Sequence, residues 1–400
     1  MPCQNDIIGL PGVEIETVGG DKSIVVEARF VGRTACVHCE AKRYRIKSTF
    51  TRKLKHTRRG NRVLEVWLRS HKFVCLVCRR YFNLRIPGVL PRRRATENFR
   101  LEVYERHHGG VSQRLLSKSH GIGEATVERW YQDFVAYRVK ELSNRHSPRV
   151  LGIDEHFFTR KQGYATTLVD LSNHKVHDVI LGRSELSLQG PLKRIRERHR
   201  TRAVVMDLSE TYRSIAKKHF PEAVIVADRF HVIRLVNHSF LKAWQQLDPA
   251  GRKNRGLLSL MRRHEWNLSR DQSAKLGSYL QARVVLKEIY DFKQRLVRIL
   301  LLRGKNKTAL RPHIHSLLEM ISQLKATTLE SLQTLGQTLE RWQEEIGRML
   351  RFSKSNGITE GFHNKMEMIS RRAFGFRNFQ NYRLRVLAHC GWDGIFGIRN

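Results

Sequence analysis

Acidic residues end two apolar runs of the chain, and a third acidic residue opens a late helix. Asp154 ends the run at 150–154, Asp207 ends the run at 203–207, and Glu360 lies on the last predicted helix. Carboxylate oxygens are the ligands that Mg²⁺ prefers. Two such ions about 4 Å apart can activate a nucleophile and carry the charge at a phosphorus atom. The pattern predicts that Asp154, Asp207 and Glu360 bind Mg²⁺, or Mn²⁺, and catalyse phosphodiester transfer.

Three neighbouring residues are expected to support these ligands rather than to hold the metal. Glu155 follows Asp154, and successive side chains of a strand point to opposite faces of the sheet. Asp228 ends a third apolar run and forms Asp-x-x-His with His231. That pair could bind a metal, but it better fits a structural latch beside the site. For Asp154 and Asp207 the open alternative is also structural, with each carboxylate capping the next helix.

Four of the six cysteines form two close pairs, Cys36 with Cys39 and Cys75 with Cys78. Two such pairs supply four thiolates, which is the number that a tetrahedral structural Zn²⁺ site needs. In a reducing compartment, pairs of this kind are typical of metal ligands rather than disulfides. We therefore predict a zinc ribbon. The alternative is two unrelated pairs of buried cysteines.

A helix-turn-helix is predicted over residues 112–130. Leu115 and Leu116 are the apolar residues of its first helix, and Gly121 lies where a tight turn requires a positive φ. The residues proposed to read DNA from the second helix are Thr126 and Arg129. The alternative is an ordinary helical pair that packs two domains together.

The rest of the chain first alternates strands with helices and then becomes helical. Strands are expected at 150–154, 164–170, 175–181, 203–207 and 223–228, with helices at 186–198 and 212–218. This alternation predicts a mixed α/β sheet whose site lies at strand ends. After His231 the chain is expected to be helical to about residue 350, with breaks at Pro249 and Pro312. The last helix is expected to be capped by Ser355 or Asn356.

These elements divide the chain into five segments: a zinc ribbon (1–90), a helix-turn-helix domain (91–148), the first part of the α/β core (149–237), an all-helical insertion (238–352) and the C-terminal part of the core (353–400). The insertion is basic and contains Trp244, Trp266 and Trp342. We expect it to contact DNA ends and to support a homodimer. Trp244 and Trp266 are the better candidates for stacking on a base, because Arg and Lys cluster around them. The alternative places all three tryptophans in the core.

The composition favours a polyanionic partner. Lys and Arg number 74 against 37 Asp and Glu, a formal net charge of +37. Nucleic acid is the commonest such partner, and double-stranded DNA is expected here. An anionic membrane fits less well, because no apolar run approaches the roughly 20 residues that span a bilayer. No secretory leader is visible, so a cytoplasmic, nucleoid-associated protein is expected. On the last helix the expected DNA contacts are Asn364, Lys365, Arg371 and Arg372.

Taken in order, these motifs resemble the ISL-three (ISL3) family of bacterial insertion-sequence transposases, over essentially the whole chain. The resemblance rests on the two cysteine pairs, the helix-turn-helix, Gly-Ile-Asp-Glu at 152–155, Met-Asp at 206–207, Ala-Asp-Arg-Phe-His at 227–231, Ser-Asn-Gly-Ile-Thr-Glu at 355–360 and Arg-Ala-Phe-Gly-Phe-Arg-Asn at 372–378. It implies an RNase H-like catalytic core with a D-D-E triad of Asp154, Asp207 and Glu360. It also implies cleavage and transfer of DNA strands at the ends of a mobile element. Arg183 and Tyr212 fall where the family has similar residues.

Two other functions remain open at this point. A transposase-derived DNA-binding regulator without catalysis would use the same zinc ribbon, helix-turn-helix and charge. The carboxylates argue against it, because binding alone needs no buried acids and these would repel phosphate. A nuclease that cuts without joining is the second alternative.

Overall fold

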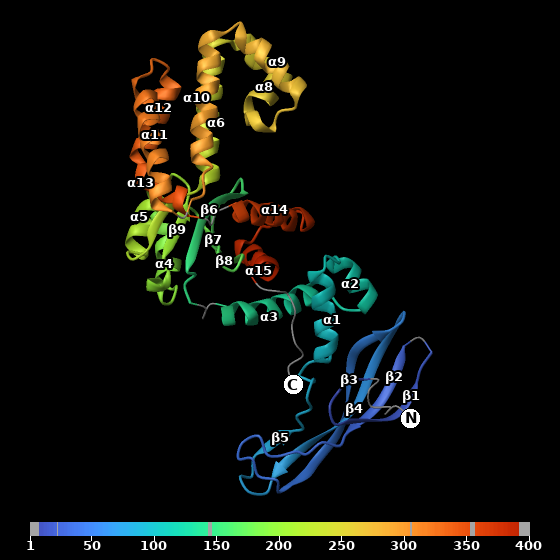
Figure 1. Cartoon of the computed structure of the whole chain (residues 1–400). Coiled ribbons are helices and arrows are strands. Elements are labelled where there is room, and N and C mark those ends of the chain that lie inside the picture. The colour runs from blue at the N-terminus through green and yellow to red at the C-terminus, as the bar shows by residue number, and fades with distance from the viewer. Residues whose placement is uncertain (1–7, 22, 143–145, 305, 353–356, 392–400) are drawn as a thin grey trace. The chain divides into compact units, whose positions relative to one another are not determined.

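The computed structural model describes residues 8–21, 23–142, 146–304, 306–352 and 357–391 (Figure 1). The chain divides into two compact units, Met1–Arg138 with Gly394–Asn400, and Val139–Asp393. The cap expected at Ser355 or Asn356 lies outside the described residues.

The first unit begins with a sheet of β1 (Val13–Gly19), β2 (Ile24–Phe30), β3 (Tyr44–Arg59), β4 (Arg62–Cys75) and β5 (Tyr81–Asn83). The strand order is β1-β2-β4-β3, and β5 pairs with β4. β3 and β4 form a long antiparallel hairpin, whereas β2 lies parallel to β4. Leu64, Val66 and Leu68 of β4 are buried, as the two-residue period of a strand requires.

Three helices follow in this unit, α1 (Glu97–His108), α2 (Gln113–His120) and α3 (Glu124–Leu142). Ser112 caps α2, because its side chain accepts a hydrogen bond from the Leu115 backbone N–H. Gly121 adopts a left-handed conformation with φ of 62° between α2 and α3, as predicted. Of the two leucines of α2, Leu116 is buried, but Leu115 is 57% exposed.

The second unit contains a five-stranded sheet in the order β10-β9-β6-β7-β8. Its strands are β6 (Val150–Thr159), β7 (Gly163–Asp170), β8 (Lys175–Leu181), β9 (Ala203–Met206) and β10 (Val224–Ala227). The first three form an antiparallel meander, and β9 and β10 run parallel to β6. The sequence prediction of a mixed α/β sheet is therefore confirmed. All four residues of β9 are buried, which explains its uninterrupted apolar run.

Helices cover both faces of this sheet. Figure 1 shows α4 (Glu185–Lys193) and α5 (Glu210–His219) on one side, and α14 (Gly357–Arg372) and α15 (Phe379–Cys390) on the other. α15 docks through Tyr382, whose ring packs against Phe158 of β6, and through Arg383, which forms a 2.6 Å ion pair with Asp178 of β8. The late chain segment that carries Glu360 and the early segment that carries Asp154 thus belong to one unit.

A block of helices separates β10 from α14. It comprises α6 (Arg229–Leu247), α7 (Pro249–Lys253), α8 (Arg255–Arg262), α9 (Arg270–Gln281), α10 (Val284–Leu300), α11 (Lys307–Ala326), α12 (Glu330–Arg341) and α13 (Gln343–Arg351). Pro249 starts α7 as predicted, but the break predicted at Pro312 was wrong, because Pro312 lies within α11. Pro312 is the sixth residue of this helix, so its missing N–H costs α11 one backbone hydrogen bond, to the carbonyl of Thr308, without ending the helix. The expected segment boundary at 237/238 falls inside α6.

Arg229 fastens the start of α6 to the ends of two other helices. Its guanidinium donates hydrogen bonds to the carbonyl oxygens of Leu300 and Leu302 at 2.7 Å, and to that of Met349 at 2.8 Å. Carbonyls at helix C-termini lack intrahelical partners and carry partial negative charge. Burial lowers the pKa of Arg229 to about 10, so the side chain stays charged at neutral pH.

The tryptophans of this block differ in exposure. Trp244 is fully buried in a cluster with α8, α9 and α10, and its Nε1–H donates to the Tyr279 hydroxyl at 2.8 Å. The expectation that Trp244 stacks on a base is therefore wrong. Basic neighbours in the sequence do not show which face of α6 a residue occupies, and Trp244 lies on the buried face. Trp342 is also buried. Trp266 is 46% exposed and stacks on His264 at 4.7 Å.

Candidate active site

Three aspartates lie at one level across neighbouring parallel strands. The last paired residues of β6, β9 and β10 are Ile153, Met206 and Ala227. Asp154, Asp207 and Asp228 each follow one of these residues, so they share one edge of the parallel part of the sheet. β6 itself continues to Thr159 beside β7. Asp154 was predicted to end its strand, but it lies inside β6. Only the pairing of β6 with β9 ends at this point.

Two histidines flank the Asp154 carboxylate, which is 7% exposed. His231 Nε2 lies 3.6 Å from Asp154 Oδ1, and His363 Nδ1 lies 3.9 Å from Oδ2. Burial disfavours the charged form of His231, but the hydrogen bond and negative charge of Asp154 outweigh it and raise the pKa of His231. His231 also lies 3.6 Å from Asp228, whose carboxylate caps α6 by accepting from the Phe230 N–H. His231 thus bridges two strands of the sheet.

Asp207 is the aspartate that burial affects most. Burial raises the pKa of Asp207 to about 6, and the nearby charges of Asp154, Glu155 and Asp228 act in the same direction. The positive charge of His231 opposes them. The Oδ1 atom of Asp207 is buried and has no hydrogen-bond partner within the described part of the chain. An ionised carboxylate in this position gains most from a bound cation.

A chain of polar contacts, which the sequence did not indicate, leads from Asp154 to α15. His363 Nε2 contacts Thr167 Oγ1 at 3.2 Å, and Thr167 Oγ1 contacts His156 Nδ1 at 3.0 Å. His156 Nε2 then meets the Tyr382 hydroxyl at 2.8 Å. Burial lowers the pKa of His156 to about 4 and also lowers that of His363, so both rings are neutral at pH 7. The signal in the sequence is weak, because the partners lie about 200 residues apart.

Glu360 lies on α14, three residues before His363, and its side chain is exposed. Its charge acts on the pKa of His363, although burial has the larger effect there. Among the described residues, the four cysteines of the first unit lie close enough together to share a metal ion. No other group of three or more His, Cys, Asp or Glu residues in that part of the chain does so. Asp154, Asp207 and Glu360 do not form such a group in this structure.

Glu155 and Asp154 have different partners, as expected for adjacent residues of a strand. Glu155 accepts two hydrogen bonds from Arg183, at 3.0 and 3.2 Å. On the same side of the sheet, the Tyr212 hydroxyl contacts Thr166 Oγ1 at 3.0 Å. Burial raises the pKa of Tyr212 to well above its usual range, and the charges of Glu155, Asp207 and Asp154 add to the effect. Arg183 and Tyr212 thus lie close to the carboxylates.

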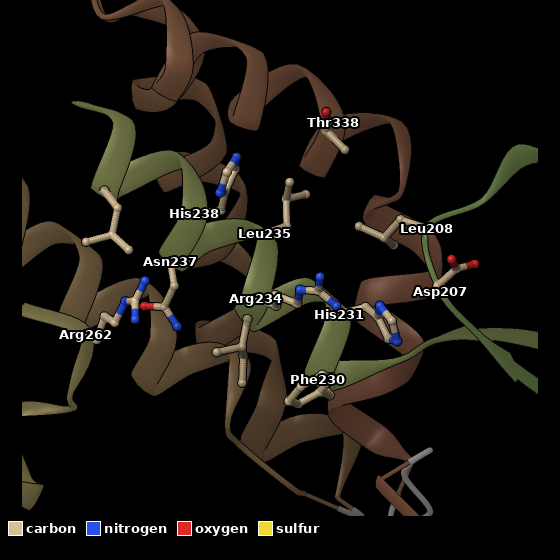
Figure 2. Close-up of a pocket in the computed structure, with 12 residues that line it drawn as sticks. Asp207, Leu208, Phe230, His231, Arg234, Leu235, Asn237, His238, Arg262 and Thr338 are labelled. Carbon is tan, nitrogen blue, oxygen red and sulfur yellow. The ribbon is translucent and has the colours of Figure 1, made fainter. Parts of the chain in front are cut away.

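A cleft of about 760 Å³ opens beside Asp207 (Figure 2). Figure 2 shows Asp207 and Leu208 at one end of the lining residues, and Asn237 with Arg262 at the other. One side is formed by α6, from Phe230 to Leu241. Leu208, Arg262 and Thr338 complete the lining.

The four cysteines converge at one end of the first unit. Cys36 Sγ lies 3.6 Å from Cys78 Sγ, and Cys39 Sγ lies 3.6 Å from Cys75 Sγ. All four sulfurs are within 4.8 Å of one another. Backbone N–H groups of Cys78 and Val77 lower the pKa of Cys75 to about 6, which favours the thiolate. The interpretation of these residues as two unrelated buried pairs is therefore wrong.

The residues proposed to contact DNA are mostly accessible. Arg129 on α3 is exposed, and Thr126 is half-buried. On α14 the remaining members, Asn364, Lys365, Arg371 and Arg372, are all exposed. Arg371 forms a 2.6 Å ion pair with Glu367 one turn before it. Among the described residues no helix is long and apolar enough to cross a membrane.

Comparison with known proteins places this chain in a family. The model of the ISL3 family, described as a transposase, matches residues 151–386. The transposase of insertion sequence element IS1001 from Bordetella parapertussis is 26% identical over 248 residues, which cover 60% of each protein. A Lactococcus lactis protein named as an ATP-dependent protease is 36% identical over 67 residues, 17% of this chain and 22% of that protein. This chain thus spans less than two thirds of both relatives. Because the family model matches more than half of its length, the chain belongs to the ISL3 transposase family.

Proposed function

We propose that this protein is a DNA transposase that binds the ends of its mobile element, cleaves them and joins them to target DNA. One observation carries the proposal beyond family membership. Asp154 and Asp207 follow paired residues of adjacent parallel strands, so their carboxylates share one edge of the sheet. That edge opens into the cleft beside Asp207.

We infer that the sheet of the second unit is an RNase H-like core. An antiparallel meander of β6, β7 and β8, extended by the parallel strands β9 and β10 on the side of β6, supports this fold. The arrangement puts the first proposed triad residue on the first strand and the second directly after the fourth. The helical block would then be an insertion between the fifth strand and α14.

The triad Asp154, Asp207 and Glu360 is proposed to hold Mg²⁺ or Mn²⁺. The donor set fits these ions, since it offers carboxylate oxygens only, and no described residue hydrogen-bonds to the buried Oδ1 of Asp207. Bound there, a divalent ion would activate the attacking oxygen and stabilise charge on the phosphate. Glu360 is three residues from His363, so the contact of His363 with Asp154 keeps α14 beside the sheet.

The protein's own groups would orient these ligands. His231 contacts both Asp154 and Asp228, and Asp228 is fixed by capping α6. Glu155 would act indirectly, because Arg183 neutralises it on the other face. Residues around metal ligands fix their orientation in this way.

The cysteine cluster is proposed to hold one structural Zn²⁺. Bonds of about 2.3 Å in a tetrahedron put the sulfurs about 3.8 Å apart. The sulfur distances of 3.6 Å fit this spacing. The ion would hold the two ends of the β3–β4 hairpin together.

Double-stranded DNA is the proposed partner of both units. Thr126 and Arg129 would contact it from α3, and Asn364, Lys365, Arg371 and Arg372 from α14. We also propose a homodimer on DNA, because two ends must be joined, with the helical block contributing to the pairing of ends.

One assay tests the proposed function against its alternatives. The protein is incubated with Mg²⁺ and DNA that carries the ends of its own element, and cut and joined products are separated on a gel. A transposase gives both products, and Asp207→Asn gives neither. Cut ends without joined products indicate a nuclease. Binding without cutting indicates a DNA-binding regulator and overturns the proposal.

A further inference from the structure

The cleft beside Asp207 is much larger than a metal site requires. Its volume of 760 Å³ lies within the range of about 300–1,000 Å³ typical of sites for small organic molecules. His231 and His238 both line it, seven residues apart on α6, which is about 10 Å of helix. That length equals about three nucleotide steps of 3.4 Å. The cleft therefore has room for part of a DNA strand beyond the phosphate held at Asp207.

The lining offers the surfaces that a nucleobase needs. Leu208, Leu235 and Leu241 make it largely apolar, and Phe230 leaves 44% of its surface exposed. Asn237 lies among them, and its Oδ1 atom is buried without a hydrogen-bond partner among the residues that the structure describes. An amide in an apolar cleft provides a donor and an acceptor for a base edge.

Two arginines give the rim of the cleft a positive charge. Arg234 and Arg262 line it and are exposed, as is the neighbouring His238. Within the part of the chain that the structure describes, none of the three forms an ion pair. Guanidinium groups that are not engaged in ion pairs suit the phosphates on either side of a base.

We propose that this cleft is a nucleotide subsite, which takes up one unstacked base of the DNA end next to the phosphate held at Asp207. Phe230 stacks on the base, and Asn237 hydrogen-bonds to its edge. Extruded bases are bound in this way, between apolar or aromatic side chains and polar groups that read the base. The inference rests on the proposed function, because it assigns the DNA end as the occupant. An apolar peptide would leave the Asn237 amide and the guanidinium groups of Arg234 and Arg262 without partners.

The first test measures base unstacking without cutting. Duplexes carrying the element's end have 2-aminopurine at single positions within three nucleotides of the cut, and Ca²⁺ replaces Mg²⁺. We expect a change in emission at one position on binding of the full-length protein. Phe230→Ala and Asn237→Leu should abolish or alter this change in emission. The DNA affinity of both variants, measured by anisotropy, should stay within about threefold of the wild-type value. Phe157→Ala, another exposed phenylalanine of the same unit, is the matched control and should behave as the wild type.

The second test is a double-mutant cycle that combines a change in the protein with a change in the DNA. On intact DNA, Phe230→Ala should slow strand cleavage about tenfold, as expected for the loss of one stacked base. An abasic residue at the unstacked position removes the same contact, so Phe230→Ala should cause little further loss on that DNA.

The outcomes separate this proposal from the proposed function. The subsite is overturned if the wild-type protein cleaves DNA, the 2-aminopurine emission stays unchanged at every position, and the effects of Phe230→Ala and of the abasic residue on cleavage are additive. The proposed transposase function would stand in that case. An emission change without cleavage in Mg²⁺ would support the subsite and count against catalysis. Failure to bind the element's ends at all would overturn both.

Discussion

A negative charge on Asp207 suits the metal site proposed above but is costly for folding. Burial raises the pKa of Asp207 to about 6, from 3.8 for the free group. A carboxylate with a raised pKa binds its proton more tightly in the folded state. Its contribution to stability is therefore fully present below pH about 4 and is lost as pH rises through about 6.

Replacing Asp207 with Asn should consequently stabilise the metal-free protein at pH 7.5, by about 1–3 kcal/mol, while abolishing strand cleavage. The gain should shrink towards zero near pH 4, where the wild-type carboxyl is also neutral. Thermal melting in EDTA at both pH values measures the effect. A lower melting temperature for Asp207→Asn at pH 7.5 would contradict the assignment of a destabilising buried charge.

His363 is the residue that ties the helix of Glu360 to the strand of Asp154. His363→Ala should slow cleavage about 10–100-fold with little change in DNA affinity, because small displacements of a catalytic group have effects of this size. His363→Gln, which keeps a polar group of similar reach, should restore part of the rate. His315→Ala, an exposed histidine of α11, is the control. If His363→Ala and His363→Gln are equally slow, or neither is slow, the positioning role fails.

At the scale of elements, apolar runs predicted the sheet well. The strand expected at 175–181 is β8, and the run at 203–207 differs from β9 by its last residue. The signal is clearest for β9, because all four of its residues are buried and a strand buried on both faces tolerates few polar residues. The strand β8 is only partly buried and contains three polar residues. Tertiary contacts gave no comparable signal. The contact of His363 with Thr167 joins residues 196 positions apart, and the burial of Trp244 depends on helices up to 46 residues later.

Arg229 shows how one side chain can hold several elements in place. Arg229→Met should lower the free energy of unfolding by about 2–4 kcal/mol, because three buried carbonyl oxygens lose their donor. Arg229→Lys should recover only part of this, since an ammonium cannot reproduce the guanidinium fork. The urea midpoint followed by circular dichroism gives the measurement. Arg234→Met, an exposed arginine of the same helix, should leave the midpoint unchanged.

In the first unit, the cysteine cluster is proposed to hold elements together as Arg229 does in the second unit. Purified protein should contain about one zinc per chain, and Cys75→Ser should remove it, because three thiolates bind the ion far more weakly than four. Cys390→Ser changes a buried cysteine outside the cluster and should keep the metal. Metal analysis by mass spectrometry reports both values. Equal zinc in the two variants would show that the cluster is not the site.

At the scale of the whole molecule, a small acidic site lies in a strongly basic chain. We expect the formal charge of +37 to attract DNA without regard to sequence. The carboxylates of the site repel phosphate until a cation neutralises them. DNA binding and cutting should therefore respond differently to the same solution conditions, binding to salt and cutting to divalent metal as well.

Affinity for DNA should fall steeply with salt, because each phosphate neutralised by Lys or Arg releases counterions. For about 6–10 contacts, affinity should drop about 10³–10⁵-fold between 50 and 200 mM salt. Arg129→Ala should reduce the slope of log affinity against log salt by about one, if Arg129 contacts a phosphate. Phe157→Ala removes no charge and should leave the slope unchanged. Anisotropy titrations with a labelled duplex measure the slopes, and binding that is insensitive to salt would mean that the excess positive charge does not face the DNA.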